Sequence, residues 1–438
     1  MICKNCGYDN PDKVTFCQNC GKRMDGKKVC PSCGAQIEED AKFCGFCGAG
    51  VEGKAKAEVA VATADENASA PAKHSNVQKV LSYVGLGLLA FSALMGFIFT
   101  FCIGIETDIA TLGKSYMLYE YFGNAYENIS TTGATVPQEI LLYLPNAFGT
   151  LISAGALIAN IVFFALTVSS AVKQFAYKRE NTNFTKYATG TFLSFALFSM
   201  LFLALHAISA TSTASSISVN GGITFNKPTL AGLVLSGIGF GGYCCCCIAS
   251  NISKFKNSKV LVNGVITLIL AIIAIVVLGL VSAPVIQLKY SYSSSYYTQK
   301  MECSVGYFMA SALSAFSGTD EYLIKLVAFE FLGFTSQIII ACLTLKLLVK
   351  FIGSVCKGDK PEKLLGSAIT NLVFSVVNIA CAVLFAQELV ENSTSLEGTS
   401  LGYAMPIALL VLNVLVLAGV IVYKVYSSRM PIAEETTY

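Results

Sequence analysis

Residues 259–282 read KVLVNGVITLILAIIAIVVLGLVS, an apolar stretch whose single charged residue is the lysine at its first position. A helix needs about 20 apolar residues to cross the ~30 Å hydrocarbon core of a bilayer. The surface helix of a soluble protein would instead keep a polar face along its length. This stretch therefore predicts a transmembrane helix and decides the fold class.

Seven further stretches of similar length and composition accompany it. Of the 438 residues, 54% are hydrophobic and 13% are charged, which is about half the charged fraction of an ordinary soluble domain. This composition excludes a water-soluble globular enzyme and a disordered chain. Besides 259–282, we predict spans at 80–105, 148–172, 187–210, 229–250, 326–349, 364–387 and 402–424.

The connections between the spans differ in their basic residues. One set holds thirteen Lys and Arg, in 173–186, 251–259, 350–363 and the tail from 424. The alternate set holds five, in 106–147, 211–228, 283–325 and 388–400. Because basic loops stay in the cytoplasm, both termini are predicted to be cytoplasmic. The expected location is the plasma membrane, with the lipid bilayer as surroundings.

The two halves of the membrane region resemble each other in loop lengths. An offset of 177 residues carries Lys173 onto Lys350, Lys186 onto Lys363 and Asn160 onto Gln337. We interpret this as two parallel four-helix repeats, 77–258 and 259–427, followed by a cytoplasmic tail, 428–438. An even number of spans gives both repeats the same orientation.

Eight cysteines lie in the polar first fifty residues, as four Cys-x-x-Cys pairs each followed by glycine. Four thiolates suit tetrahedral zinc, and paired knuckles commonly supply them. We expect a reducing compartment, because no secretory signal precedes these residues, and this argues against disulfides. Spacing alone does not select zinc over iron. The predicted ligands of two zinc ions are Cys3, Cys6, Cys17 and Cys20, then Cys30, Cys33, Cys44 and Cys47.

This segment resembles the zinc-ribbon family in its tandem, double-ribbon form, through the paired Cys-x-x-Cys-Gly motifs of residues 1–50. The resemblance implies small β-rich modules, here 1–24 and 25–50, that bind proteins or nucleic acids. Residues 1–50 hold seven basic and six acidic residues, so two zinc ions with eight thiolates give a net charge of −3. A protein partner is therefore favoured over nucleic acid. Residues 51–76 are predicted to be a flexible linker.

Polar groups inside the spans are few. Glu330 and Lys346 lie near span ends, from which both are expected to reach the membrane interfaces. For His206 we favour an interhelical hydrogen bond, with a proton or metal group as the alternative. Gly237 and Gly241 form a Gly-x-x-x-Gly pair, which predicts close helix packing. Mid-span amides are expected to join helices or, where the repeats pair them, to line a path between the halves. These amides are Asn160, Gln337, Asn371, Asn378 and Asn413.

Two further clusters have alternative readings. Cys244–Cys247 point around a helix, so they are read as small apolar filler, with lipidation as the alternative. Eleven tyrosines of the two long outer loops are read as an interfacial belt or as a ligand surface. They are tyrosines 116, 119, 121, 126, 143, 290, 292, 296, 297, 307 and 322.

Catalytic motifs are absent from the sequence, and its two histidines leave few candidates for acid–base catalysis. The leading hypothesis is a non-enzymatic, zinc-binding membrane protein. Its cytoplasmic ribbons would act as a protein-interaction module or as a regulatory module. The alternative is a transporter or channel for an uncharged or lipid-like solute, with its path between the halves. The expected fold is an α-helical multi-pass membrane protein with a β-rich N-terminal double zinc ribbon. Oligomeric state is left open.

Overall fold

The computed structural model divides the chain into two units, Met1–Ala70 and Pro71–Tyr438. All described residues belong to the second unit. They are 76–107, 116–120, 135–177, 183–213, 218–293, 298–308, 319–357, 361, 363–391 and 400–428. The eight predicted metal ligands, Cys3 to Cys47, and the linker therefore lie outside the described residues.

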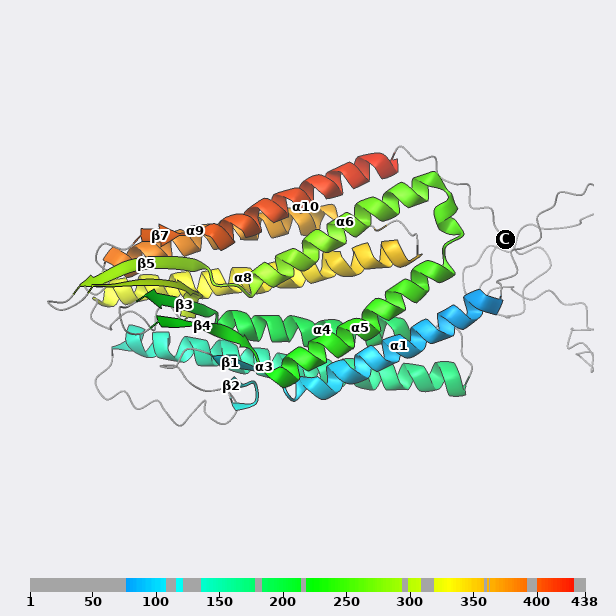
Figure 1. Ribbon diagram of the computed structural model, residues 1–438, viewed down its shortest axis with the longest axis horizontal. Helices are drawn as coiled ribbons and strands as arrows, with labels where there is room; N and C mark the ends of the chain where they lie inside the picture. The colour runs from blue at the N-terminus through cyan, green and yellow to red at the C-terminus, as the bar shows by residue number, and fades with distance from the viewer. Residues whose placement is uncertain are drawn as a thin grey trace, which may run out of the picture. The chain divides into compact units, whose positions relative to one another are not determined.

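Eight long helices form the second unit, and each is long and apolar enough to cross a membrane. They run alternately in opposite directions (Figure 1). Every predicted span is matched by one helix. The helices are α1 (Asn76–Thr100), α3 (Val136–Ala171), α4 (Phe184–Leu205), α5 (Lys227–Ser250), α6 (Ser258–Val281), α8 (Asp320–Lys357), α9 (Leu365–Glu391) and α10 (Ala404–Ser428).

Two helices, α3 and α8, are much longer than predicted. α3 begins twelve residues before the expected 148 and continues through Pro145, and α8 begins with Asp320 and Glu321 in its first turn. Acidic residues at a helix N-terminus are stabilised by the helix dipole. A window chosen for apolar residues ends before such polar turns, so it underestimates both helices.

Aliphatic side chains cover the outside of the helices. Leu151, Ile158, Ile238, Ile275 and Val422 are each more than half exposed, and they come from four different helices. Apolar surface on this scale is unfavourable in water and is what a hydrocarbon solvent accepts.

The helices form two groups. In the first, α1 packs mainly on α5, and α3 mainly on α4. In the second, α8 packs on both α6 and α9, and α10 packs on α9 and α6. Contacts of α3, α4 and α5 with α8 join the groups. These groups coincide with the two predicted halves, but their duplication stays a prediction.

A seven-stranded antiparallel sheet covers one end of the bundle (Figure 1). All four connections of that end contribute to it, in the order β2-β1-β4-β3-β6-β5-β7. The central pair, β3 and β6, comes from different halves. The strands are β1 (Gly104–Thr107), β2 (Tyr116–Met117), β3 (Ile208–Thr213), β4 (Ser218–Phe225), β5 (Ile286–Ser293), β6 (Thr298–Val305) and β7 (Ser400–Gly402).

The expectation that these connections are loops is wrong, because they form this sheet. The signal is present in β5, where Ile286 and Leu288 alternate with Gln287 and Lys289. Alternation of apolar and polar residues predicts a half-buried strand. In the structure Ile286 and Leu288 are fully buried against the helices, so one face of the sheet belongs to the core.

The largest hydrophobic core lies below this sheet and includes both halves. Phe148 of α3 meets Phe334 of α8 with ring centroids 5.1 Å apart, and Phe308 lies 5.0 Å from Phe334. Edge-to-face aromatic pairs of this kind add stability beyond the area they bury. The two halves are therefore packed against each other near the sheet.

Small residues bring α1 and α5 together, but not the predicted pair. Side chains on Gly237 or Gly241 would meet nothing within 4 Å. Close packing occurs instead at Gly239, where an added Cβ would lie 3.0 Å from the Leu88 carbonyl oxygen. The Ser92 hydroxyl donates to the Ser236 carbonyl oxygen at 2.7 Å on the same seam. The prediction for Gly237 and Gly241 was wrong because they lie on the opposite side of the helix.

Candidate functional site

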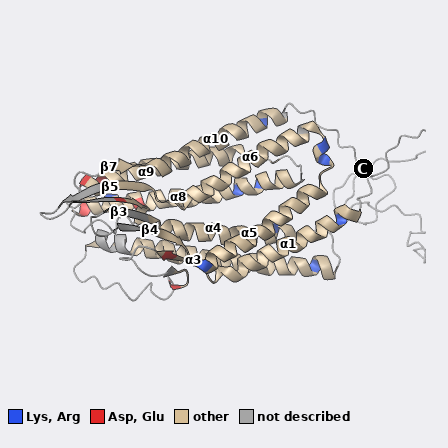
Figure 2. Cartoon of the chain, in the orientation of Figure 1, with Lys and Arg blue, Asp and Glu red and all other residues tan. Residues whose placement is uncertain are grey.

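Acidic residues gather at the sheet end of the bundle, and most lysines lie at the other end, although Lys227, Lys289, Lys300 and Lys325 are at the sheet end (Figure 2). Among the described residues, all nine acidic positions lie at the sheet end. They are Glu106, Glu120, Glu139, Glu302, Asp320, Glu321, Glu330, Glu388 and Glu391. Eleven lysines lie at the opposite end, which we call the basic end. They are Lys79, Lys173, Lys186, Lys254, Lys256, Lys259, Lys346, Lys350, Lys357, Lys363 and Lys424.

The five predicted mid-span amides are all buried. Four have hydrogen bonds that identify what they join. The Asn160 side-chain oxygen accepts from the Ser194 hydroxyl at 2.9 Å, which joins α3 to α4. Asn371 donates to the Thr344 hydroxyl at 2.8 Å, which joins α9 to α8.

The other two amides extend this pattern within the second half. Asn378 donates to the Ser336 hydroxyl at 2.9 Å, and Asn413 donates to the Ser375 hydroxyl at 2.9 Å. Each of the four bonds joins helices of one half. This arrangement favours the role of joining helices over that of lining a path between the halves.

The ionisable candidates are placed differently from one another. Glu330 is fully buried in α8, so the expectation that it reaches the interface was wrong, because its side chain lies against neighbouring helices. Lys346, about four turns further along the same helix, is exposed as expected. His206 directly follows α4, and its Nδ1 lies 3.0 Å from the Phe202 carbonyl oxygen one turn earlier. Its ring also packs on the Phe202 ring. The structure does not bring these three residues together.

Cys244–Cys247 point in different directions, as their spacing requires. Cys245 is exposed. Cys246 faces α1, where a Cβ on Gly85 would lie 3.0 Å from its own Cβ. The Cys356 thiol of α8 lies 4.0 Å from the Cys244 carbonyl oxygen. No group of three or more metal-binding side chains is found among the described residues.

A cavity of about 230 Å³ opens between the halves at the basic end. Thr185, Lys186 and Thr189 line it from α4, with Phe240 and Tyr243 from α5. The opposite wall is α8, through residues from Val349 to Cys356.

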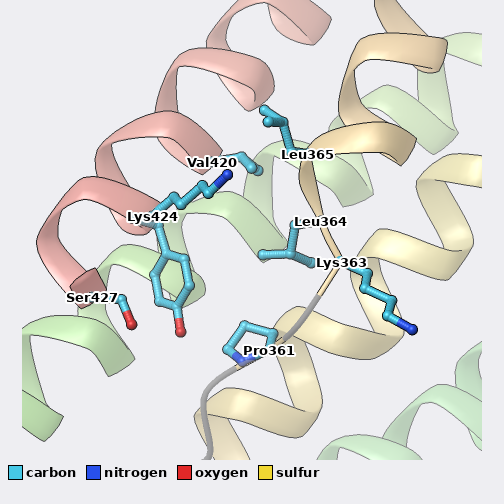
Figure 3. A pocket seen from close by; sticks show the side chains of 8 residues that line it. Pro361, Lys363, Leu364, Leu365, Val420, Lys424 and Ser427 are labelled. Carbon is cyan, nitrogen blue, oxygen red and sulfur yellow. The ribbon is translucent and has the colours of Figure 1, made fainter. Parts of the chain in front are cut away.

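A second pocket, of about 340 Å³, lies within the second half at the same end (Figure 3). Pro361, Lys363, Leu364 and Leu365 line it at the start of α9. Val420, Tyr423, Lys424 and Ser427 line it from α10. Sequence reasoning missed this site, although the α10 residues recur with the spacing of one helix face. We refer to it as the lysine pocket.

The outer tyrosines divide between surface and core. Tyr119 and Tyr143 are exposed, as an interfacial belt or an external surface requires. Tyr307 and Tyr322 are buried in the main core, so neither reading applies to them. The other seven are not described, or their side chains are not.

The eight apolar helices, with apolar surface outside and charge at the two ends, are those of a membrane protein. The N-terminal segment is assigned separately: residues 3–48 match the model of the double zinc ribbon family. This confirms the resemblance noted in the sequence and supports zinc binding. No curated protein and no solved structure matches the chain.

Proposed function

We propose that this protein is a non-enzymatic integral membrane protein that binds zinc through its N-terminal double ribbon. The ribbon acts on the cytoplasmic side, as a module that binds a protein partner or regulates the membrane region. The observation that carries the proposal is one chain holding both the match at residues 3–48 and eight membrane-length helices.

The charge of the bundle supports this orientation. The first helix, α1, begins at the basic end with Asn76, and the last helix, α10, ends there with Ser428. Basic residues are retained on the cytoplasmic side during insertion. Both chain termini are therefore assigned to the cytoplasm, and the sheet to the opposite side of the plasma membrane.

The ribbon's charge supports a protein partner. With two bound zinc ions, residues 1–50 have a formal charge of −3. Nucleic-acid affinity depends on neutralising phosphates with basic residues, which this segment lacks in excess.

The orientation is tested with protease in sealed, inside-out membrane vesicles. A peptide tag inserted into linker 51–76 should be removed, while the same tag inserted into connection 121–134 should survive until detergent is added. The reverse pattern would contradict the orientation. Recovery of the protein in the soluble fraction after alkaline washing would contradict membrane insertion itself.

The partner role is tested by crosslinking in intact cells with full-length protein. We expect one or more defined proteins to crosslink to the wild type and to be lost from the Cys17→Ser variant, which should keep its membrane insertion. A Cys102→Ser variant, outside the ribbons, is the matched control. Identical crosslinking by all three proteins would argue against a zinc-dependent module.

A second candidate function is transport of an uncharged or lipid-like solute. The observation in its favour is the cavity between α4, α5 and α8, which opens at the basic end while the main core fills the sheet end. Buried charge, which ion-coupled transport requires, is scarce in the helices.

Flux into proteoliposomes distinguishes the two candidates. A transporter should show saturable uptake that falls when Thr189→Phe fills the cavity. Thr370→Phe, on the exposed side of α9, should leave uptake unchanged. Glu330→Gln would show whether the buried carboxyl takes part. Uptake no faster than in empty liposomes, for every solute tried, would favour the non-transporting role.

A further inference from the structure

The lysine pocket combines features that one kind of ligand uses together. Its α10 wall presents Val420, Tyr423, Lys424 and Ser427 on one helix face. Figure 3 shows the Lys424 side chain reaching toward Leu365 at the start of α9, while the Lys363 side chain points away from α10. A cation, hydroxyls and aliphatic groups therefore share one opening.

One polar group of the pocket has an unsatisfied hydrogen-bonding capacity. Tyr423 is 4% exposed. Its buried hydroxyl interacts with the Ser427 side chain of the same pocket, but forms no hydrogen bond of standard geometry in the described part of the chain. Leaving a buried hydroxyl unpaired is costly. An acceptor brought by a ligand would satisfy it.

The backbone at the rim is strained. Lys363 has a φ of 56°, the one positive φ outside glycine among the described residues. A lysine in this conformation is uncommon, and such outliers concentrate where function requires a particular residue. The Lys350 ammonium donates to the Lys363 carbonyl oxygen at 3.3 Å, which adds a third lysine near the rim.

The surroundings are basic on one side and apolar on the other. The sequence from Lys346 to Lys363 has five lysines, with Asp359 and Glu362 as its acidic residues. On the bilayer side, Ile369 of α9 and Ile421 of α10 are each 46% exposed. A ligand that matches both the basic and the apolar surroundings has an anionic head and long apolar chains.

We propose that the lysine pocket binds the phosphate headgroup of an anionic glycerophospholipid in the leaflet at the basic end. Lys424 supplies the cation, and the Tyr423 and Ser427 hydroxyls donate to phosphate oxygens. Lys363 lies at the rim, and rotation of its flexible stem would bring its ammonium group to the headgroup. The acyl chains lie on the aliphatic surfaces of α9 and α10. Basic pockets between helices are a recurring form of lipid recognition.

The test measures lipid retained by the full-length protein after mild extraction from vesicles of 80% phosphatidylcholine and 20% phosphatidylglycerol. Wild type should be enriched in phosphatidylglycerol. Lys424→Gln should lower this enrichment about fivefold, the size expected of one lysine near an anionic surface. The control is Lys256→Gln, an exposed lysine at the same end but outside the pocket, which should leave the enrichment unchanged. Equal losses in both variants would show diffuse attraction and overturn the site.

Two further arms complete the test. Tyr423→Phe should lower phosphatidylglycerol retention, yet in neutral detergent without that lipid its unfolding temperature should match or exceed wild type. Unchanged retention by Tyr423→Phe would show that the Tyr423 hydroxyl does not bind the lipid. Inorganic phosphate, added with the total ionic strength held at about 0.15 M, should leave retention intact; full displacement would indicate a site for free phosphate and overturn the lipid assignment.

This inference rests on the proposed membrane insertion, and the two fail in different ways. Recovery in the soluble fraction would reject both. Recovery in the membrane without phosphatidylglycerol enrichment would reject the lipid site alone.

Discussion

The hydroxyl of Tyr307 donates a 2.9 Å hydrogen bond to the backbone carbonyl oxygen of Asn378. Tyr307 follows β6 by two residues, and Asn378 lies in the middle of α9. The Asn378 amide in turn donates to the Gly333 carbonyl oxygen of α8 at 3.2 Å. Two buried side chains, Tyr307 and Asn378, therefore tie the end of β6 to α9 and α9 to α8.

Gly333 is predicted to be intolerant of any side chain. A Cβ at this position would overlap the Tyr307 ring. Glycine to alanine in a helix normally stabilises by up to ~1 kcal/mol, but overpacking a fixed ring costs about 1–3 kcal/mol. Gly333→Ala should therefore lower the unfolding temperature in detergent. Gly353→Ala in the same helix, which meets nothing within 4 Å, should raise it or leave it unchanged; a similar loss in both would contradict the overlap.

The Tyr307 hydroxyl should contribute measurably to stability. Tyr307→Phe keeps the ring in place and removes the bond to Asn378, at a cost of about 1 kcal/mol. The comparison is Tyr83→Phe, because Tyr83 is 67% exposed and its hydroxyl is not in the core. Denaturant titration of both variants measures the difference. Equal stabilities would mean that the bond contributes nothing.

Asn160 and Ser194 should be energetically coupled. A double-mutant cycle with Asn160→Ala and Ser194→Ala should give a coupling energy of about 0.6 kcal/mol, and at most about 1.7. The control cycle pairs Asn160 with Ser199, whose hydroxyl bonds the Phe195 carbonyl of its own helix. That cycle should give a coupling near zero. Equal couplings in the two cycles would reject the interhelical role.

Cys303 should react slowly with thiol reagents in the folded protein. Burial raises the pKa of the Cys303 thiol from 9.0 to about 11. The thiolate is the reactive form, so labelling by a water-soluble maleimide should rise about tenfold per pH unit up to about pH 11. At pH 8, unfolding should speed labelling at least about a hundredfold. Peptide-resolved mass spectrometry measures the rate, with Cys303→Ser as control; rapid labelling of folded protein at pH 8 would contradict this.

Zinc content should follow the two-site assignment. Purified full-length protein should contain two zinc ions per chain by elemental analysis, and Cys17→Ser should contain one, since the remaining three thiolates no longer close a structural site. Cys102→Ser, in the membrane unit, should retain two. Iron in place of zinc would correct the metal, and an unchanged content in Cys17→Ser would refute the ligand assignment.

The helical part of the fold could be read from composition because a helix in lipid satisfies its own backbone and faces an apolar solvent. Residues 259–282 need no partner to be identified as a span, and α6 (Ser258–Val281) matches them within one residue at each end. The spacing of the Cys-x-x-Cys pairs likewise predicts a zinc ribbon without knowledge of the tertiary structure. The family match at residues 3–48 agrees with that prediction.

Side-chain pairings could not be read in this way. Asn160 and Gln337 were equivalent by position, yet Asn160 bonds Ser194 of its own half. Gly237 and Gly241 had the right spacing for packing, yet α1 packs against Gly239. In a helix hydrophobic on every side, the sequence does not say which face meets a neighbour.

The sequence by itself determined the eight spans, their alternation, the charge difference between loops and the N-terminal cysteine groups. Each depends on local composition or spacing. Only the tertiary structure decided that four separate connections form one sheet, that Tyr307 bonds Asn378 and that Lys424 of α10 shares a pocket with Leu365 of α9. Each of these joins segments or faces whose meeting depends on how the helices are rotated and packed, and that information is not local.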